Sequence, residues 1–206
     1  TEVGMRECFR PRPGCIYAVS DYAAFELRTW AQVCLTCLGT SRLAEVLKTR
    51  DPHVELACRI MGISYEEAFA DYKRDPHGRV YYPRQSSKAA NFGFPGGLGP
   101  RQWRHYARKN YGVVVTEEKA FEIYDFWLQA WPESQEYFDW IGSQVESSSP
   151  MIEQLFVGRY RGDVSFTEAA NGMFQSLAAD AAKNAGFLIA RACYVEPESP
   201  LFGCRP

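Results

Sequence analysis

The chain has 206 residues, of which 46% are hydrophobic and 15% aromatic. Such a composition can bury the core of one sizeable domain or two small ones, and it excludes a disordered chain. The formal net charge of −2 argues against a protein that binds nucleic acid through its overall charge. Basic residues nevertheless gather between positions 101 and 109, and a local basic face can still contact phosphates.

Cysteine usage and hydropathy bound the compartment. Seven cysteines, an odd number, argue against a disulfide scaffold and favour a reducing environment. Cys34 and Cys37 form a CxxC pair with apolar flanks and no second pair, which favours buried core thiols over a zinc site. The sequence has no signal peptide and no apolar run of membrane-spanning length, so we expect a cytoplasmic protein with no membrane partner.

The first predicted elements are a strand and a helix. Residues 15–20 are short, apolar and follow a Pro-Gly turn, which predicts a buried strand. Asp21 follows it and leads into a helix that we expect to end near residue 38. A carboxylate at a strand end suits a hard divalent cation, but Asp21 suits the N-cap of the helix equally well. The residues alone leave both interpretations open.

Further helices are predicted over 42–49, 52–61 and 64–71, before a loop over 73–83. Asp51 is the expected N-cap of the second of these, with Pro52 in its first turn. His53 then lies close to the positive helix end, where we expect it to be exposed. It is either an ordinary surface residue or a group that contacts an anion.

The stretch over residues 84–97 carries the clearest chemistry. On a helix over 84–93, Arg84, Lys88 and Phe92 are spaced four residues apart and stack on one face, with steps of about 6 Å. Two cations and one aromatic ring in a line match the phosphates, sugar and base of a nucleoside triphosphate. An amphipathic helix with solvated cations is the alternative. The glycines and proline over 95–99 then predict a flexible joint, as a closing lid needs.

The remainder is predicted to be mostly helical. Helices are expected over 100–110, 116–128 and 132–145, with Phe121, Tyr124 and Leu128 as one apolar core stripe. Residues 151–161 indicate a strand pair that turns at glycine, and residues 166–193 predict the longest helix. The whole pattern therefore predicts an α+β chain that is predominantly helical.

Three blocks in this order resemble the family A DNA polymerases, the family of bacterial DNA polymerase I. Residues 21–28, Asp-Tyr-Ala-Ala-Phe-Glu-Leu-Arg, resemble motif A, and residues 84–93, Arg-x-x-x-Lys-x-x-x-Phe-Gly, resemble motif B on the mobile fingers helix. Residues 51–53 and 169–180 fall where the family has related segments. The resemblance covers nearly the whole chain, and its Pro-Gly-Gly variant resembles bacteriophage relatives.

The resemblance implies a division into part of the palm (1–28), the fingers (29–150) and a return to the palm (151–206), with an incomplete antiparallel palm sheet. Motif C, which carries a second metal-binding carboxylate, has no counterpart in this sequence. We therefore expect a fragment of a template-directed DNA polymerase that is inactive in isolation and self-associates through the incomplete palm. A single-subunit RNA polymerase and a non-catalytic nucleic-acid-binding helical module are the alternatives.

The resemblance also implies a role for each candidate residue. Two Mg²⁺ ions would bind Asp21 with help from the backbone carbonyl of Tyr22, and Glu26 would act as a gate that excludes the ribose 2′-hydroxyl. The expected deoxynucleoside triphosphate ligands are Arg84, Lys88, His53 and Phe92, and the expected contacts to primer-template DNA are Asn171, Gln175 and Arg104. Two positions depart from the family: Gly96 replaces a usual tyrosine, and Thr167 replaces a usual arginine.

Overall fold

The computed structural model describes residue 4 and residues 8–205. The ends of the first and last predicted segments, residues 1–3, 5–7 and 206, lie outside this description. Within the described part, the order of elements is α1 (Phe25–Leu38), α2 (Arg42–Thr49), α3 (Pro52–Met61), α4 (Tyr65–Arg74), α5 (Tyr81–Gly93), the 3-10 turn η2 (Phe94–Gly96), α6 (Pro100–Tyr111), α7 (Glu117–Ala130), α8 (Glu133–Gln144), β1 (Met151–Glu153), β2 (Tyr160–Gly162) and α9 (Phe166–Tyr194). The predicted α+β fold, mainly helical, is confirmed.

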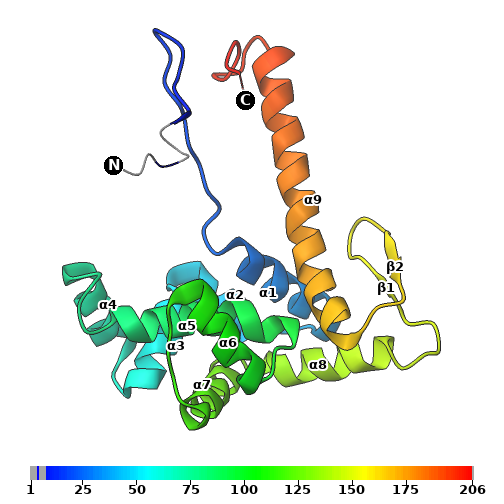
Figure 1. Ribbon diagram of the computed structural model, residues 1–206. Helices are drawn as coiled ribbons and strands as arrows, with labels where there is room; N and C mark the ends of the chain where they lie inside the picture. Colours follow the sequence, from blue (N-terminus) through cyan, green and yellow to red (C-terminus); the bar gives the residue numbers. More distant parts are fainter. Residues whose placement is uncertain (1–3, 5–7, 206) are drawn as a thin grey trace.

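Helices α1 to α8 form one body from which α9 projects (Figure 1). Helix α3 packs on α5, α5 on α6, and the first half of α9 on α1, η2 and α8. The distal half of α9 exposes apolar side chains, including Phe187, Leu188 and Ile189. No helix in the described part of the chain is both long enough and apolar enough to cross a membrane.

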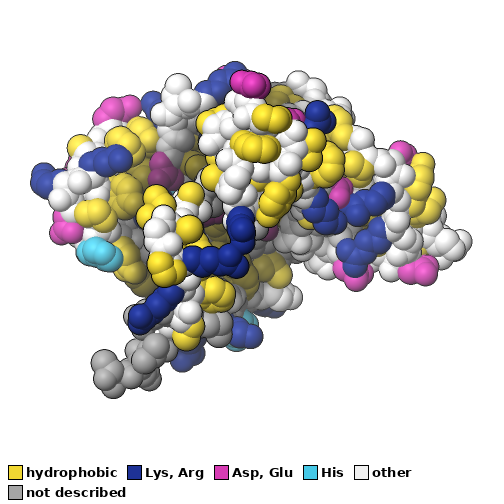
Figure 2. All heavy atoms as spheres, turned by 90° about the horizontal axis from the view of Figure 1, so that it is seen from above, with side chains coloured by type: hydrophobic (Ala, Val, Ile, Leu, Met, Phe, Trp, Pro, Cys, Tyr) yellow, Lys and Arg dark blue, Asp and Glu magenta, His cyan; other side chains and the backbone are white. Residues whose placement is uncertain are grey.

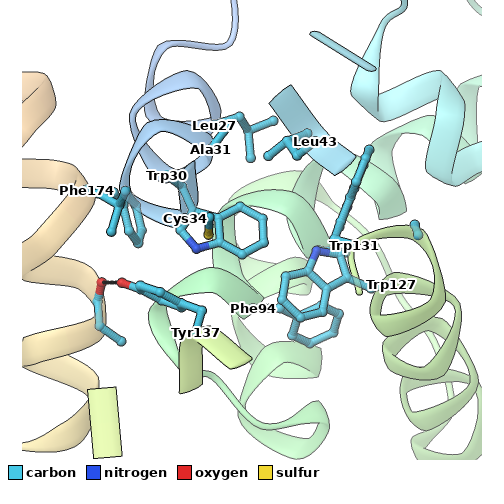
Figure 3. Packing of buried hydrophobic residues seen from close by; sticks show 14 of the residues in the cluster. Leu27, Trp30, Ala31, Cys34, Leu43, Phe94, Trp127, Trp131, Tyr137 and Phe174 are labelled. Carbon is cyan, nitrogen blue, oxygen red and sulfur yellow. Dashed lines mark hydrogen bonds between the residues drawn. The ribbon is translucent and has the colours of Figure 1, made fainter. Parts of the chain in front are cut away.

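Aromatic residues dominate the core (Figure 3). Trp30 of α1 stacks on Trp127 of α7 with ring centroids 5.7 Å apart, and Phe94 of η2 packs against Trp127 at 5.3 Å. Tyr137 of α8 is fully buried and donates its hydroxyl hydrogen to the Ala170 carbonyl of α9 at 2.6 Å. Burying rings of this size removes much apolar surface from water, which fixes the arrangement of α1, α7, α8 and α9.

Helix caps set the starts of several helices. Asp51 is the N-cap of α3, as predicted, and its carboxylate accepts from the His53 and Val54 amides. Ser165 and Glu168 form a complete capping box at α9.

The Cys34 thiol is fully buried and that of Cys37 partly so, and burial raises the pKa of both, which confirms the interpretation as core thiols.

Two predictions about strands had different outcomes. The pair over 151–161 is confirmed: β1 and β2 are antiparallel, with Ile152 opposite Arg161. The prediction of a buried strand over 15–20 was wrong. This segment is not paired with another strand, and Ile16 and Val19 are 91% and 92% exposed. A strand needs a backbone ladder to a neighbour, and within the described residues the paired strands are β1 and β2, while residues 15–20 join no ladder.

Some helix boundaries and faces also differ from prediction. Helix α5 begins at Tyr81, inside the predicted loop, and includes Pro83 in its first turn, where a missing N–H costs little. On α7 the buried residues are Ala120, Ile123, Trp127 and Ala130, while Phe121 is 43% exposed. Tyr124 and Leu128 are partly buried and pack against the core, so the predicted stripe flanks the observed core face and only Phe121 lies off it.

Candidate functional site

A cleft of about 550 Å³ opens where the start of α1 meets α3 and α5. Several candidate residues from distant parts of the sequence line it: Asp21, Tyr22, Glu26, His53, Arg84, Lys88 and Phe92. Arg28, Arg50 and Asp51 also line it, so four cationic side chains face three carboxylates. From above, where residues 8–24 and α9 project, the surface interleaves basic and apolar side chains (Figure 2).

Helix α5 presents its row of candidate side chains because the residues on its other face are small. Ser86, Ser87, Ala89 and Ala90 are buried, and short side chains let a helix approach its neighbours closely. The remaining face leaves Arg84, Lys88 and Phe92 half-buried along the cleft. The predicted line of two cations and one ring is thus brought together on one side of one cavity.

Arg84 is held by two neighbours. Its Nη2 donates to Asp51 Oδ2 at 2.8 Å, and its guanidinium lies over the Tyr72 ring, 4.5 Å from the centroid. Burial by itself would raise the pKa of Asp51, but the Arg84 guanidinium outweighs burial and lowers that pKa overall. Arg84 is therefore positioned as a cation with one carboxylate partner already in place.

His53 is buried at 6% exposure, so the prediction of an exposed histidine was wrong. Helix α5 packs over the first turn of α3, and the His53 ring lies 5.6 Å from the Phe92 ring between centroids. Burial, with Arg84 and Lys88 nearby, lowers the pKa of His53 to about 4 despite the opposing charge of Asp51. The ring is therefore neutral near pH 7.

The chain reaches the cleft through a left-handed residue. Ala24 has φ of 50° and precedes α1 as its N-cap, without a side-chain hydrogen bond. The interpretation of Asp21 as that N-cap was therefore wrong, and Asp21 is exposed on the cleft wall. A non-glycine residue in this region costs about 1 to 2 kcal/mol, and the turn directs Asp21 and Tyr22 toward α3 and α5.

Magnesium binds through oxygen ligands, commonly one or two carboxylates together with substrate phosphates. Asp21 offers one such carboxylate. The described residues contain no group of three or more His, Cys, Asp or Glu side chains that could hold a metal ion. The described residues therefore do not by themselves form the two-ion site that the resemblance implies.

A second cavity of about 500 Å³ adjoins the cleft, and Glu26 and Phe92 line both. Its other walls include Tyr106, Tyr111 and Gln175. Burial raises the pKa of Glu26, and burial together with the nearby Tyr106 hydroxyl raises that of Tyr111. Glu26 and Phe92 therefore form the boundary between a cationic compartment and an aromatic one.

Asn171 joins α9 to η2. Its Nδ2 donates to the Gly96 carbonyl at 3.2 Å and to the Thr167 carbonyl at 3.1 Å. A Cβ at Gly96 would lie 2.2 Å from Asn171 Oδ1. The segment Phe94–Gly96 is buried, so the predicted joint is packed against α9, and this contact explains why residue 96 is a glycine.

The structure also adds residues that the sequence did not single out. Asn91 contacts His53 directly, and Trp131 contacts Asn91. The Tyr72 ring packs against the Arg84 guanidinium. Arg50 lines the cleft and pairs with Glu55 at 3.0 Å. In the sequence, the signal for one of these residues was that Asn91 directly precedes the candidate residue Phe92. Arg104 lies on α6 and lines neither of the two cavities.

The site therefore has the features of a pocket for a polyanionic ligand with an apolar end. No protein-family model matches the chain. Over 184 residues, 89% of its length, the chain is 26% identical to DNA polymerase I of Aquifex aeolicus (strain VF5). The match spans 30% of that protein, so the chain is similar to about a third of a DNA polymerase.

Proposed function

We propose that this chain forms the nucleotide-binding part of a template-directed DNA polymerase and takes a deoxynucleoside triphosphate in the cleft between α1, α3 and α5. The observation that carries the proposal is the convergence of Arg84, Lys88, His53 and Phe92 on one cavity. The similarity to a DNA polymerase I over most of the chain supports the same reading. In this proposal residues 29–150 act as the fingers, with palm segments on either side.

The phosphates would lie against the cationic end of the cleft. Arg84 can bind phosphate oxygens with two parallel N–H groups, and Lys88 can add a mobile point charge one helical turn further along. Each charge-assisted hydrogen bond is worth about 1.5 to 3 kcal/mol. Arg84 would exchange its Asp51 partner for phosphate when the ligand binds.

The sugar and base would lie toward the second cavity. Phe92 offers an apolar ring for the sugar, and Glu26 beside it would crowd a 2′-hydroxyl. Tyr106, Tyr111 and Gln175 line the adjoining cavity and are candidates for contacts to the primer-template. Asn171 lines the same cavity and is a further candidate for that contact, and its amide is also bonded to the Gly96 carbonyl.

In the proposed reaction, a primer 3′-hydroxyl attacks the α-phosphate of the bound triphosphate and pyrophosphate leaves. The residues of this chain would bind and orient the triphosphate for in-line attack, which is a large share of the catalysis of such transfers. Asp21 and the Tyr22 carbonyl are the proposed contacts for metal that arrives with the triphosphate.

The test is a titration of the purified chain with dGTP in the presence of Mg²⁺. Lys88→Ala and Arg84→Ala should each weaken binding about tenfold or more, which corresponds to losing one charge-assisted hydrogen bond. Lys109→Ala, an exposed lysine on α6 outside both cavities, is the matched control. Equal affinity in all four proteins would refute the site.

The same titration separates the alternatives. A single-subunit RNA polymerase would bind GTP at least as well as dGTP. A non-catalytic nucleic-acid-binding module would bind duplex DNA but no triphosphate, and its DNA affinity would be independent of Asp21.

A further inference from the structure

A buried chain of hydrogen bonds leads from Trp131 to His53. The indole Nε1 of Trp131 donates to Asn91 Oδ1 at 2.9 Å, and Asn91 Nδ2 lies 3.2 Å from the Pro52 carbonyl oxygen and 3.1 Å from His53 Nδ1. Trp131, Asn91 and His53 are 0%, 1% and 6% exposed. Trp131 belongs to the aromatic core (Figure 3), so one end of this series of hydrogen bonds is fixed in the core.

The chemistry of the two outer partners fixes the orientation of the Asn91 amide. An indole nitrogen only donates, so it must face the amide oxygen. A backbone carbonyl only accepts, so the Pro52 oxygen must face the amide nitrogen. Both constraints select the same orientation, and turning the amide over would break both bonds.

This orientation in turn fixes the hydrogen on His53. The amide nitrogen of Asn91 is a donor, so His53 Nδ1 must accept and carries no hydrogen. In a neutral imidazole the hydrogen then sits on Nε2. Neutrality itself follows from burial and from the flanking Arg84 and Lys88, against which only Asp51 acts.

His53 lines the cleft, and its Nδ1 is already engaged by Asn91, which leaves Nε2 for a ligand. We propose that Asn91, oriented by Trp131, is a positioning residue that holds His53 as a neutral Nε2–H donor toward the phosphates of a bound nucleoside triphosphate. This inference rests on the proposed function of the cleft. The opposite tautomer would point a lone pair at phosphate oxygens and repel them.

The tautomer is measurable in the ligand-free protein. Long-range ¹H–¹⁵N NMR spectra distinguish protonated from unprotonated imidazole nitrogens, and His53→Gln assigns the signal among the three histidines. We expect one tautomer near pH 7, with hydrogen on Nε2. A hydrogen on Nδ1 in the unaltered protein would overturn the inference.

Trp131→Phe tests the positioning. It keeps an aromatic ring but removes the donor that orients Asn91, so we expect a mixture of tautomers and about threefold to tenfold weaker dGTP binding. The matched control is Trp103→Phe, since Trp103 is also fully buried but its Nε1 has no hydrogen-bond partner. Identical tautomer and affinity in the two variants would overturn the role of Trp131.

Asn91→Asp provides a second variant, independent of indole packing. A carboxylate can still accept from Trp131 but cannot donate to His53, so the hydrogen should move to Nδ1 and dGTP binding should weaken. Retention of the Nε2 hydrogen would contradict the role of Asn91. If the unaltered protein has the expected tautomer but binds no triphosphate, the proposed function and the role of His53 toward phosphate both fail, whereas the tautomer assignment stands.

Discussion

Asp51 uses its two carboxylate oxygens for different partners. Its Oδ1 accepts from the His53 amide at 2.8 Å and caps α3, while its Oδ2 accepts from Arg84 Nη2 at 2.8 Å. The cap places His53, and the ion pair places Arg84. One residue between two helices therefore positions two of the proposed phosphate ligands.

Asp51→Asn separates these two roles. Asparagine caps helices as well as aspartate does, but it no longer holds Arg84 by charge and no longer repels a polyanion. We expect dGTP to bind about fivefold more tightly, equivalent to about 1 kcal/mol, the size of a partly exposed ion pair. Isothermal titration measures this directly.

Glu117→Gln is the matched control for Asp51→Asn, because Glu117 pairs with Arg101 at 2.8 Å away from the cleft. Its affinity for dGTP should equal that of the unaltered protein. Unchanged or weaker binding by Asp51→Asn would mean that Arg84 acts only as a structural partner of α3.

Gly96→Ala should destabilise the chain by about 1 to 3 kcal/mol, the usual cost of overpacking. The new Cβ would lie 2.2 Å from Asn171 Oδ1, where something must shift. Asn171→Ala removes the obstacle, so the double variant should be more stable than the sum of the two single effects implies. Urea unfolding of the unaltered protein and of these three variants measures this coupling.

Gly142→Ala on α8 is the control for the glycine change itself, since a Cβ there meets nothing within 4 Å. It should stabilise the chain by about 0.5 to 1 kcal/mol, because alanine favours helix over glycine. Additive effects of Gly96→Ala and Asn171→Ala would show that the η2–α9 contact does not limit residue 96.

The helices were largely predictable because their starts depend on local chemistry. Asp51 and Ser64 cap α3 and α4 through their own side chains, and these signals are written in neighbouring residues. The strand over 15–20 failed for the opposite reason: its apolar residues indicate burial, but pairing depends on distant segments. Ile16, at 91% exposure, had no such partner among the described residues.

The sequence was enough to predict which residues line the site, but not the burial of each residue or its hydrogen-bond partners. The fourfold spacing of Arg84, Lys88 and Phe92 placed them on one face, and the structure puts that face on a cleft. The burial of His53 depends on how α5 packs over α3, and its link to Trp131 crosses 78 positions through Asn91. Tertiary contacts of this kind leave no local pattern.

Glu26→Ala should relax discrimination between dGTP and GTP. Glu26 lines both cavities beside Phe92, so shortening it opens room for a 2′-hydroxyl. The ratio of the two dissociation constants should fall by about tenfold, near 1.4 kcal/mol, mainly through tighter GTP binding. The control is Glu45→Ala, because Glu45 is an exposed residue of α2 that pairs with Lys48 at 2.7 Å. If Glu26→Ala still discriminated strictly against GTP, Glu26 would not act as the gate.

His53 should make the stability of the chain depend on pH between about 6.5 and 4. The folded pKa of about 4 lies below the usual value of 6.5, so in this window the unfolded chain binds the proton and the folded chain does not. Stability therefore falls as pH drops through 6.5 and levels off, for this group, below about 4. Between pH 7.5 and pH 5 the loss should be about 2 kcal/mol.

His53→Gln removes this contribution. Between pH 7.5 and pH 5, the free energy of unfolding of the variant should therefore fall by about 2 kcal/mol less than that of the unaltered protein. Asp51 titrates in a lower window, because its pKa is lowered from 3.8 by Arg84, and therefore does not mask the difference at pH 5. His105→Gln, at an exposed position on α6, is the control and should keep the full dependence. Urea unfolding at pH 7.5, 6 and 5 measures this difference. Parallel curves for His53→Gln and the unaltered protein would mean that the pKa of His53 is the same in the folded and the unfolded chain, which would contradict the effect of its burial.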